Sequence, residues 1–318
     1  MHVEISEKLP GGVEELAHAS SRATFYHGRT WLESVAAAHP RMVLRCVVAR
    51  RGSDLLGYLP FFILRYGPFQ RAWSLPFGTY GGPVAVEGEA EAALLVCYAR
   101  LTRDLRTLEA GWVDFAGTGL AWGTGAPAQT HLVDLSAGFD ALWKDRFARK
   151  RRQYARGAER SGVTVTRSLD SCDVRAYYRV YAARLARLGA RSPHPERLFT
   201  ELFARGGEGV RVYLARRQGE VVGGHFNFYH RDSVIAWYNV TTPAGDDLRA
   251  GSLLYATCMR DACADGFRTY NLGGSLGKAS LIRYKESLGG EPYNYTTHRR
   301  FGRLGRLAWG VARARRGR

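Results

Sequence analysis

The chain has 318 residues, 46% of them hydrophobic and 12% aromatic, which indicates a globular protein with two ordinary domains or one large one. Its five cysteines include no Cys-x-x-Cys pair, so neither a disulfide framework nor a zinc site is expected. The net charge of +17 favours polyanionic partners, either nucleic acid or an anionic membrane surface. The acidic N-terminal segment is unlike a signal peptide, and the most apolar run, Leu55–Leu64, is too short to span a bilayer. We therefore expect a cytoplasmic protein, with peripheral contact at the inner face of the membrane as a further candidate.

Two helices are predicted between residues 12 and 39, followed by a β-hairpin in which Arg45–Ala49 and Leu55–Leu64 flank a Gly-Ser-Asp turn. The same hairpin recurs 166 residues later, because Arg45–Arg65 aligns without a gap with Arg211–Arg231 and is identical at seven of 21 positions. Four of these identities are arginines in an arginine-rich chain. The shared apolar pattern and turn therefore support the repeat as much as the identities do.

The order of elements after each hairpin is repeated as well. A strand follows each hairpin, then a helix with a Leu-Leu pair over residues 90–108 or 248–264, then a strand that ends in glycine at Val113–Gly117 or Tyr270–Gly274. The predicted fold is α/β (α+β), with two tandem units, each a mixed, mostly antiparallel sheet flanked by helices. Chance similarity among common α/β elements is the alternative.

The predicted domains are residues 1–140, residues 141–300 and a basic C-terminal segment, 301–318, for which packing on the first domain is one candidate arrangement. Between the hairpins, the sequence predicts a strand at His131–Leu135, one helix over Asp140–Arg160, and helices over residues 174–188 and 196–204. In the C-terminal segment, four apolar residues recur at helical spacing among arginines: Phe301, Leu304, Ala308 and Val311. This pattern predicts a basic amphipathic helix that lies on a membrane, contacts RNA or packs on the fold.

Two short segments carry most of the net charge. Lys144–Arg160 contains eight basic and two acidic residues, and Arg299–Arg318 contains eight arginines and no acidic residue. Such concentrated positive charge attracts polyphosphates, although a general preference for arginine would also produce it.

The stretch Tyr270–Tyr295 begins like a strand, continues through several glycines and contains two of the chain's five lysines, Lys278 and Lys285. Lysine differs from the prevailing arginine because the pKa of its compact ammonium group shifts readily on burial. No helix is predicted after the glycines, so we interpret them as the end of a strand, and the loop that follows is expected to place Lys285 in the site. A glycine-rich loop with solvated charges is the alternative.

Five segments, in this order, resemble the FemAB-type aminoacyltransferases, a branch of the GNAT acyltransferase superfamily with two tandem units, and their acetyltransferase relatives. They are Trp31 in an early helix, Gly57–Pro60, LPFGTYGGP at Leu75–Pro83, ARKRRQYARGAERSGVTV at Ala148–Val165, and RYKESLGGEP at Arg283–Pro292. The last resembles the family's aromatic-Lys-x-x-aromatic-Gly segment, with Leu288 in place of the second aromatic residue. The long helical arm that members acting on cell-wall precursors often carry has no counterpart in the sequence.

The resemblance implies an acyltransferase, and one loop bears on the identity of its donor. GNAT enzymes that use acyl-CoA bind the pyrophosphate with Gln/Arg-x-x-Gly-x-Gly/Ala at a helix N-terminus. The equivalent segment here is LRAGSLL, in which Leu248 and Leu253 occupy the basic and the final small position. In the family this loss accompanies aminoacyl-tRNA as the donor, and dense arginines suit an RNA backbone. We expect transfer from aminoacyl-tRNA to an amine on a small molecule, peptide or cell-envelope precursor, with no cofactor and no metal.

The resemblance also assigns roles to individual residues. Lys285 and Asn271 are assigned catalytic roles, and Lys285 is expected near the donor's terminal phosphate or the developing charge. Asp114 is a candidate base, although an aspartate at a strand end more often caps a turn. The donor-binding positions are Trp237, Tyr238, Asn239, Gly273, Arg283, Tyr284, Arg151 and Arg152. The acceptor-binding positions are Phe77, Tyr80 and Gly81, in a loop expected to face the second unit.

Two other functions remain open at this point. One is an N-acyltransferase that uses acyl-CoA in polysaccharide or natural-product synthesis, which CoA binding would support. The other is a non-catalytic basic scaffold on a membrane or on RNA, which would keep its cellular activity when Lys285 is replaced.

Overall fold

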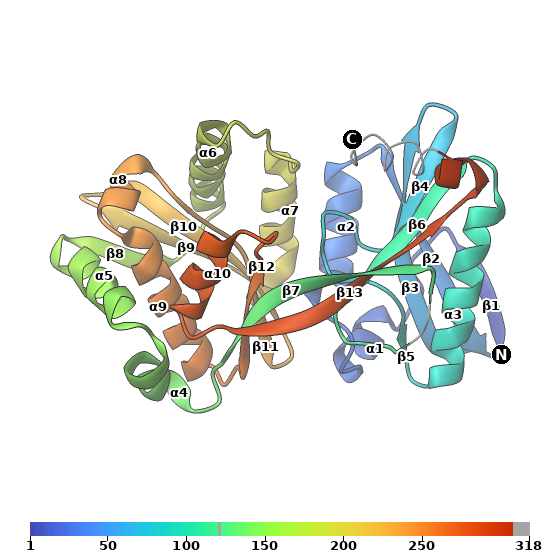
Figure 1. The fold of residues 1–318 in the computed structure, drawn as a ribbon, viewed down its shortest axis with the longest axis horizontal. Helices are drawn as coiled ribbons and strands as arrows, with labels where there is room; N and C mark the ends of the chain where they lie inside the picture. Colours follow the sequence, from blue (N-terminus) through green and yellow to red (C-terminus); the bar gives the residue numbers. More distant parts are fainter. Residues whose placement is uncertain (120–121, 308–318) are drawn as a thin grey trace. The chain divides into compact units, whose positions relative to one another are not determined.

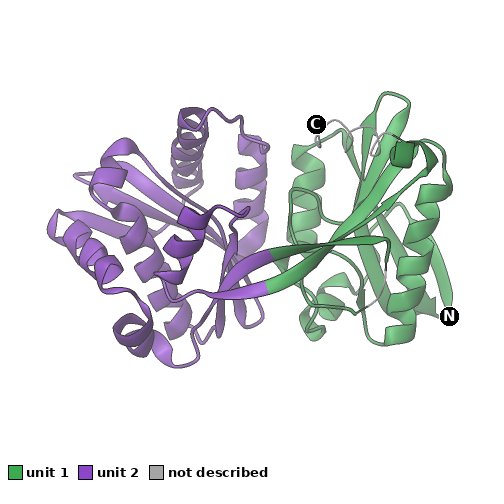
Figure 2. Cartoon of the chain, viewed as in Figure 1, with its two compact units in different colours: residues 1–128, 294–318 green, residues 129–293 purple. Residues whose placement is uncertain are grey.

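The computed structural model describes residues 1–119 and 122–307. The chain divides into two compact units, coloured separately in Figure 2: unit 1 is Met1–Ala128 with Asn294–Arg318, and unit 2 is Gln129–Tyr293. Each unit contains a mixed, mostly antiparallel sheet with helices against it (Figure 1), so the predicted fold class is confirmed. Among the described residues, no helix is long and apolar enough to cross a membrane.

Unit 1 has the strand order β1-β2-β3-β4-β6-β13, with β5 paired to β3. All neighbouring strands with a described register are antiparallel except β4 and β6, which are parallel. The strands are β1 (His2–Ser6), β2 (Met42–Arg51), β3 (Asp54–Tyr66), β4 (Phe69–Trp73), β5 (Val84–Ala85), β6 (Thr107–Asp114) and β13 (Glu291–Phe301). The helices are α1 (Val13–Ala19), α2 (Arg29–Ala38) and α3 (Gly88–Arg100), with short 3-10 turns η1 (Phe25–His27) and η2 (Leu101–Arg103).

Unit 2 has the strand order β7-β12-β11-β10-β9-β8, in which β11 and β12 are parallel. The strands are β7 (Thr124–Asp134), β8 (Val163–Arg167), β9 (Val210–Arg217), β10 (Glu220–His230), β11 (Ser233–Thr241) and β12 (Thr269–Gly274). The helices are α4 (Gly138–Ala141), η3 (Leu142–Arg146), α5 (Arg149–Arg160), α6 (Ser171–Arg187), α7 (Glu196–Gly206), η4 (Gly207–Gly209), α8 (Pro243–Asp247), α9 (Ala250–Ala264) and α10 (Ala279–Glu286).

Helices cover both faces of the unit 2 sheet. On β10, Phe226 packs against Tyr177 of α6, whereas the next residue, Asn227, donates a hydrogen bond to Cys258 of α9. Successive side chains of a strand point to opposite faces, so α6 and α9 lie on opposite sides of the sheet. The helix α5 packs with α9 in one apolar core.

The repeat inferred from the sequence is present in the register of the two hairpins. Ala49 lies opposite Gly57 in β2–β3, and Ala215 lies opposite Gly223 in β9–β10, which preserves the offset of 166. Both hairpins also contain a β-bulge at the equivalent position, where the register skips Leu56 or Val222. A bulge is a local feature that must be specified separately from strand pairing, so its recurrence argues against chance similarity.

The repeated glycines are tightly enclosed, which gives a test of their role. A Cβ atom on Gly57 would lie 2.8 Å from the Cβ of Ala85, and one on Gly223 would meet its nearest atom at 3.0 Å. We expect Gly57→Ala to lower the free energy of unfolding by roughly 1–3 kcal/mol through overpacking, and Gly223→Ala to lower it by less. Denaturant unfolding measures both. Gly88→Ala is the control, because a Cβ there meets no atom within 4 Å; an equal loss in this variant would contradict the explanation.

The boundaries of the units differ from the predicted divisions at residues 140 and 300. Both β7 and β13 run from one unit into the other, so unit 1 ends at Ala128 and resumes at Asn294. The sequence pattern placed the strand at His131–Leu135 but did not show that it begins at Thr124.

Two predicted helices are also wrong in part. The helix predicted over Asp140–Arg160 is interrupted at Phe147, which has an extended backbone and a side chain only 2% exposed, because its ring packs into the core of unit 2. In the C-terminal segment, Phe301 ends β13 instead of starting a helix, since this residue pairs with Glu109 of β6. Residues 303–307 are helical, and Ala308 and Val311 lie outside the described residues.

Candidate active site

The candidate site lies in unit 2, where the pairing of β11 with β12 ends. The parallel register runs from Ser233 opposite Thr269 to Ile235 opposite Asn271, although β11 continues to Thr241 and β12 to Gly274. A bulge at Trp237 interrupts the pairing of β11 with β10 at the same level. The predicted positions Trp237, Tyr238 and Asn239 on β11, and Asn271 and Gly273 on β12, are therefore all at or beyond the last pair.

Lys285 lies in the helix α10, not in a loop as predicted. The helix begins directly after the glycine-containing turn, where Leu276 and Gly277 both have positive φ angles of 49° and 70°. Lys285 and Leu288, three residues apart, are both buried, as expected for one face of a helix. The sequence prediction missed this helix because the glycines before it were interpreted as the end of a strand followed by a loop. The glycines therefore do precede a helix, contrary to the prediction.

The ammonium group of Lys285 is held at the end of β12. Its Nζ donates hydrogen bonds to the carbonyl oxygens of Gly273 and Gly274, the latter at 2.8 Å. The residue is 3% exposed, and burial lowers the pKa of Lys285 to about 8, because the charged form loses its hydration. The amine is therefore fixed in position and releases its proton more readily than an exposed lysine.

A buried polar group fixes the backbone beside this lysine. The Oδ1 of Asn271 accepts hydrogen bonds from Oγ1 of Thr130 at 2.7 Å and from the backbone N–H of Gly273 at 2.9 Å. Gly273 has a φ angle of 73°, a left-handed conformation that favours glycine. Asn271 thus holds the turn whose carbonyl groups bind Lys285, which is a positioning role.

His131 on β7 is a member of the site that the sequence did not single out. Its side chain is fully buried, and neither ring nitrogen has a hydrogen-bond partner among the described residues. Burial lowers the pKa of His131, and the positive charge of Lys285 lowers it further. The imidazole is therefore neutral near pH 7. In the sequence, His131 is only a histidine inside a predicted strand, and its proximity to Lys285 depends on the β7–β12 pairing.

Aromatic side chains anchor β11 on the side of α6 and α7. The ring of Trp237 lies 4.9 Å from that of Phe199. The carbonyl oxygen of Tyr238 accepts a hydrogen bond from the hydroxyl of Tyr177 at 2.9 Å, and the hydroxyl of Tyr238 lies 3.3 Å from Nε2 of His194. The backbone of the bulged segment is therefore held rigidly. His194 was not predicted, because it belongs to a proline-flanked loop without a recognisable motif.

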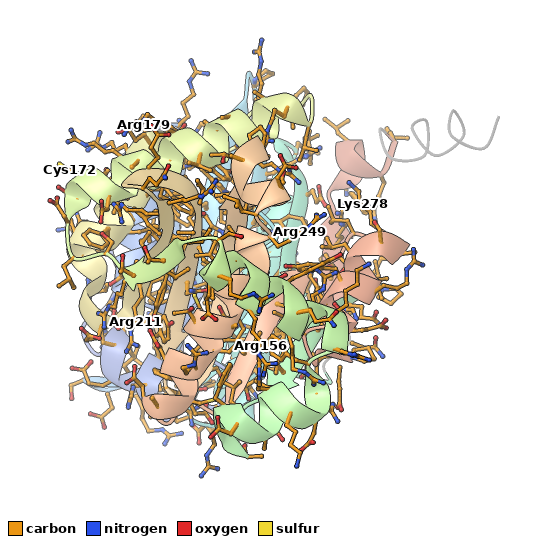
Figure 3. All side chains as sticks on the ribbon, turned by 90° about the vertical axis from the view of Figure 1, so that its left-hand side faces the viewer. Arg156, Cys172, Arg179, Arg211, Arg249 and Lys278 are labelled. Carbon is orange, nitrogen blue, oxygen red and sulfur yellow. The ribbon has the colours of Figure 1, made fainter. Side chains whose placement is uncertain are left out.

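On the other side of the sheet, arginines alternate with aromatic rings around the first turn of α9. The guanidinium carbon of Arg151 lies 4.3 Å from the ring centroid of Tyr284, and its Nε donates to Oγ of Ser287 at 2.8 Å. Arg249 lies 5.0 Å from the ring centroid of Tyr154. Burial raises the pKa of Tyr284 to about 12, although Arg151 opposes this effect. Figure 3 shows the side chains at this end of unit 2, with Arg156 and Arg249 labelled.

Arg249 is a basic residue next to the basic position of the degraded loop. Arg249 immediately precedes α9 and has a left-handed backbone conformation, with φ 60°. Its guanidinium group lies over the ring of Tyr154. In the motif alignment the basic position falls on Leu248, the residue before Arg249. Backbone N–H groups and the dipole at the start of a helix favour anions, and Arg249 adds a full positive charge there.

Two of the predicted donor-binding arginines are placed differently from Arg151. Arg152 points its Nη1 at the carbonyl oxygens of Trp143, Lys144 and Phe147, at 2.6–2.9 Å, and so caps the end of η3. Arg283 is exposed on α10. Arg151 therefore lies among the aromatic rings, whereas Arg152 supports the backbone.

Asp114 in unit 1 caps a turn. Its carboxylate accepts hydrogen bonds from the backbone N–H groups of Gly117 and Thr118 at 2.9 and 2.8 Å, and lies 3.6 Å from Nε2 of His298. Burial raises the pKa of Asp114, but the hydrogen bonds from His298 and from the turn outweigh burial and hold the pKa below its ordinary value. A carboxylate with a lowered pKa is a weak base, so this geometry favours the capping role.

The predicted acceptor-binding residues also lie in unit 1. Tyr80 is 5% exposed and stacks on Phe115 with a centroid separation of 4.2 Å. Phe77 has a φ angle of 72° and is half-buried. A Cβ atom on Gly81 would lie 2.5 Å from the carbonyl oxygen of Ser74, which explains the glycine by close backbone packing. The acceptor role of these three residues remains a prediction.

Comparison with known proteins identifies the fold. Residues 144–293 match the family model described as an acetyltransferase (GNAT) domain, so unit 2 is a GNAT domain and the protein is an acyltransferase. No curated protein matches the sequence. The predicted GNAT recognition is thereby confirmed.

Solved structures show that the fold of the whole chain is similar to that of several known proteins. FemX superposes with a TM-score of 0.69 at 13% identity, over 92% of this chain and 96% of its own. The C-terminal domain of a putative lysylphosphatidylglycerol synthetase from Agrobacterium fabrum gives 0.62 at 13% identity, over 94% and 93%. A tandem GNAT protein from the clavulanic acid biosynthesis pathway gives 0.50 at 17% identity, over 94% and 98%. At these identities the similarity concerns the fold.

Proposed function

We propose that the protein transfers an aminoacyl group from aminoacyl-tRNA to an amine acceptor. The observation that carries the proposal is the alternation of arginine and aromatic side chains around the start of α9, where Arg151 stacks on Tyr284 and Arg249 on Tyr154. Fixed guanidinium groups bind phosphates, and adjacent aromatic rings stack on unpaired bases, which is the combination that single-stranded RNA ends require.

The proposed reaction needs little chemical activation. The acceptor amine attacks the carbonyl carbon of the ester, a C–N bond forms, the C–O bond to the ribose breaks, and the ribose oxygen leaves with the proton lost by the amine. Because the ester is already activated, the enzyme mainly has to align the amine and stabilise the oxyanion. The rigid backbone of Trp237–Asn239 and the ammonium group of Lys285 are the groups assigned to these tasks.

The names of the similar structures support aminoacyl transfer. One is a putative lysylphosphatidylglycerol synthetase, a name that describes an aminoacylated product, and another is FemX. For the acceptor of the present protein, the proposal specifies an amine group and no particular molecule.

An acyl-CoA donor is the second candidate, because the matching family model is described as an acetyltransferase domain. The first turn of α9 also offers Gly251 and backbone N–H groups to a pyrophosphate. Calorimetric titration with CoA distinguishes the candidates: saturable CoA binding together with absent tRNA binding would overturn the tRNA proposal.

The donor proposal is tested by charge reversal at the start of α9. We expect Arg151→Glu and Arg249→Glu each to weaken aminoacyl-tRNA binding at least tenfold, and to reduce the salt dependence of binding, because each removes a phosphate contact. Arg179→Glu on α6 is the matched control, an exposed arginine on the opposite side of the sheet, and should bind normally. Filter binding at several salt concentrations measures the effect, and equal losses in all three variants would show a nonspecific charge effect instead.

A further inference from the structure

The described part of unit 1 carries an exposed surface that combines apolar and basic side chains at one end of the sheet. Five large hydrophobic residues there are 37–69% exposed: Tyr66, Phe69, Leu105, Leu304 and Leu307. We call this surface, with the exposed arginines that accompany it (Arg65, Arg103, Arg106, Arg303 and Arg306), the hairpin-end patch.

Three segments that are distant in the sequence form the hairpin-end patch. The first is the tip of the β3–β4 hairpin, where Tyr66 lies opposite Phe69. The second is the turn before β6, which is joined to the hairpin because the backbone N–H of Gln70 donates to the carbonyl oxygen of Arg106 at 2.8 Å. Figure 1 shows the hairpin, this turn and the helical residues 303–307 at the same end of unit 1.

The third segment, residues 302–307, is fixed to the start of β6, directly after this turn, by close backbone contact. The N–H of Gly302 donates to the carbonyl oxygen of Leu108 at 3.0 Å, and a Cβ atom on Gly305 would lie 1.8 Å from that oxygen. Only glycine permits this approach. The exposed side chains of Leu304 and Leu307 are therefore held in place beside the turn that carries Leu105.

The charge of these segments is strongly positive. Residues 65–71, 102–106 and 299–307 contain eight arginines and a single acidic residue, Asp104. The guanidinium group of Arg71 lies 5.5 Å from the ring centroid of Tyr66, so an aromatic ring and a cation are presented together at the hairpin tip. The sequence predicted part of this charge as a basic amphipathic helix, but not the hairpin and the turn that complete the surface.

We propose that the hairpin-end patch binds the surface of an anionic lipid bilayer. Aromatic rings at a hairpin tip suit the headgroup region, aliphatic side chains suit the acyl boundary, and arginines bind anionic headgroups. RNA is a poorer fit for this surface, because the three leucines neither stack on bases nor form hydrogen bonds. The surface protrudes as a hairpin tip and a helix end, whereas peptide ligands are usually bound in a groove or along a strand edge.

The proposal is tested by co-sedimentation of the whole protein with vesicles made of equal amounts of phosphatidylglycerol and phosphatidylcholine, and with vesicles of phosphatidylcholine alone. The intact protein should bind the anionic vesicles and lose binding as salt is raised. Two double variants, Tyr66→Ser with Phe69→Ser and Arg65→Glu with Arg303→Glu, should each bind at least tenfold more weakly. Both replace exposed side chains, and circular dichroism checks that they remain folded.

Matched controls in unit 2 separate the patch from general hydrophobicity and charge. Leu169→Ser with Leu188→Ser removes two highly exposed leucines, and Arg179→Glu with Arg191→Glu reverses two exposed arginines. Both controls should bind anionic vesicles normally. The proposal would be overturned if the intact protein failed to bind the anionic vesicles, or if the patch variants bound them as well as the intact protein does. It would also be overturned if the patch variants lost RNA binding but kept vesicle binding.

Discussion

Lys285→Ala is expected to lower kcat/KM for acyl transfer at least tenfold, or about 1.4 kcal/mol in the activation free energy. The reason is geometric: the ammonium group is fixed by the carbonyl oxygens of Gly273 and Gly274 at the end of β12, beside the point where β11 and β12 stop pairing. Its removal deletes the positive charge assigned to the reacting centre. Steady-state kinetics with an aminoacyl-tRNA donor and an amine acceptor measures the loss.

Lys278→Ala is the matched control for this prediction. Lys278 belongs to the same turn and precedes α10, but its side chain is exposed. Its replacement should leave kcat/KM nearly unchanged. If Lys285→Ala remained fully active while folded, the catalytic assignment of Lys285 would be wrong.

The second large effect is on stability at alkaline pH. The pKa of Lys285 is about 8 in the folded protein, below its ordinary value of 10.5. Between these pH values the unfolded chain binds more protons than the folded protein, so the folded state gains stability as pH rises through this interval. The gain amounts to about 3 kcal/mol relative to a variant without the amine.

The comparison is made with Lys285→Met, which fills a similar volume without a charge. The difference in unfolding free energy between the native protein and this variant should be constant below pH 8 and should shift in favour of the native protein from pH 8 to pH 10.5. Urea unfolding at several pH values provides this difference, because all other ionisable groups are common to both proteins. A difference that stayed flat across the interval would show that Lys285 keeps its ordinary pKa.

The features that the sequence predicted best are those determined by local pattern. The two hairpins were found because an alternating apolar pattern with a turn is specified within about twenty residues. Their common packing is also carried by the sequence, since a Cβ atom on Gly57 or on Gly223 would meet a leucine of a following helix, Leu94 or Leu254. The fold class followed from this repetition.

The candidate site was harder to predict because its members meet through tertiary structure. His131 approaches Lys285 only because β7 pairs with β12. Arg249 was not singled out because it lies one residue after the motif's basic position, and its left-handed backbone conformation is not visible in the sequence. The helix α10 is eight residues long and begins after a strained turn, so its own sequence gives little helical signal.

The two strands that cross between the units have a consequence for biosynthesis. Strand β6 of unit 1 ends at Asp114 and is completed by β13, whose paired residues begin at Thr296. At ordinary translation rates the ribosome needs roughly 10–40 s to add the intervening residues. Throughout this time the nascent first unit has an open sheet edge at β6, while all of unit 2 is synthesised before β13 can close it. The amino-terminal unit is therefore the last to be completed, and its unpaired edge is where a nascent chain is most exposed to misassociation.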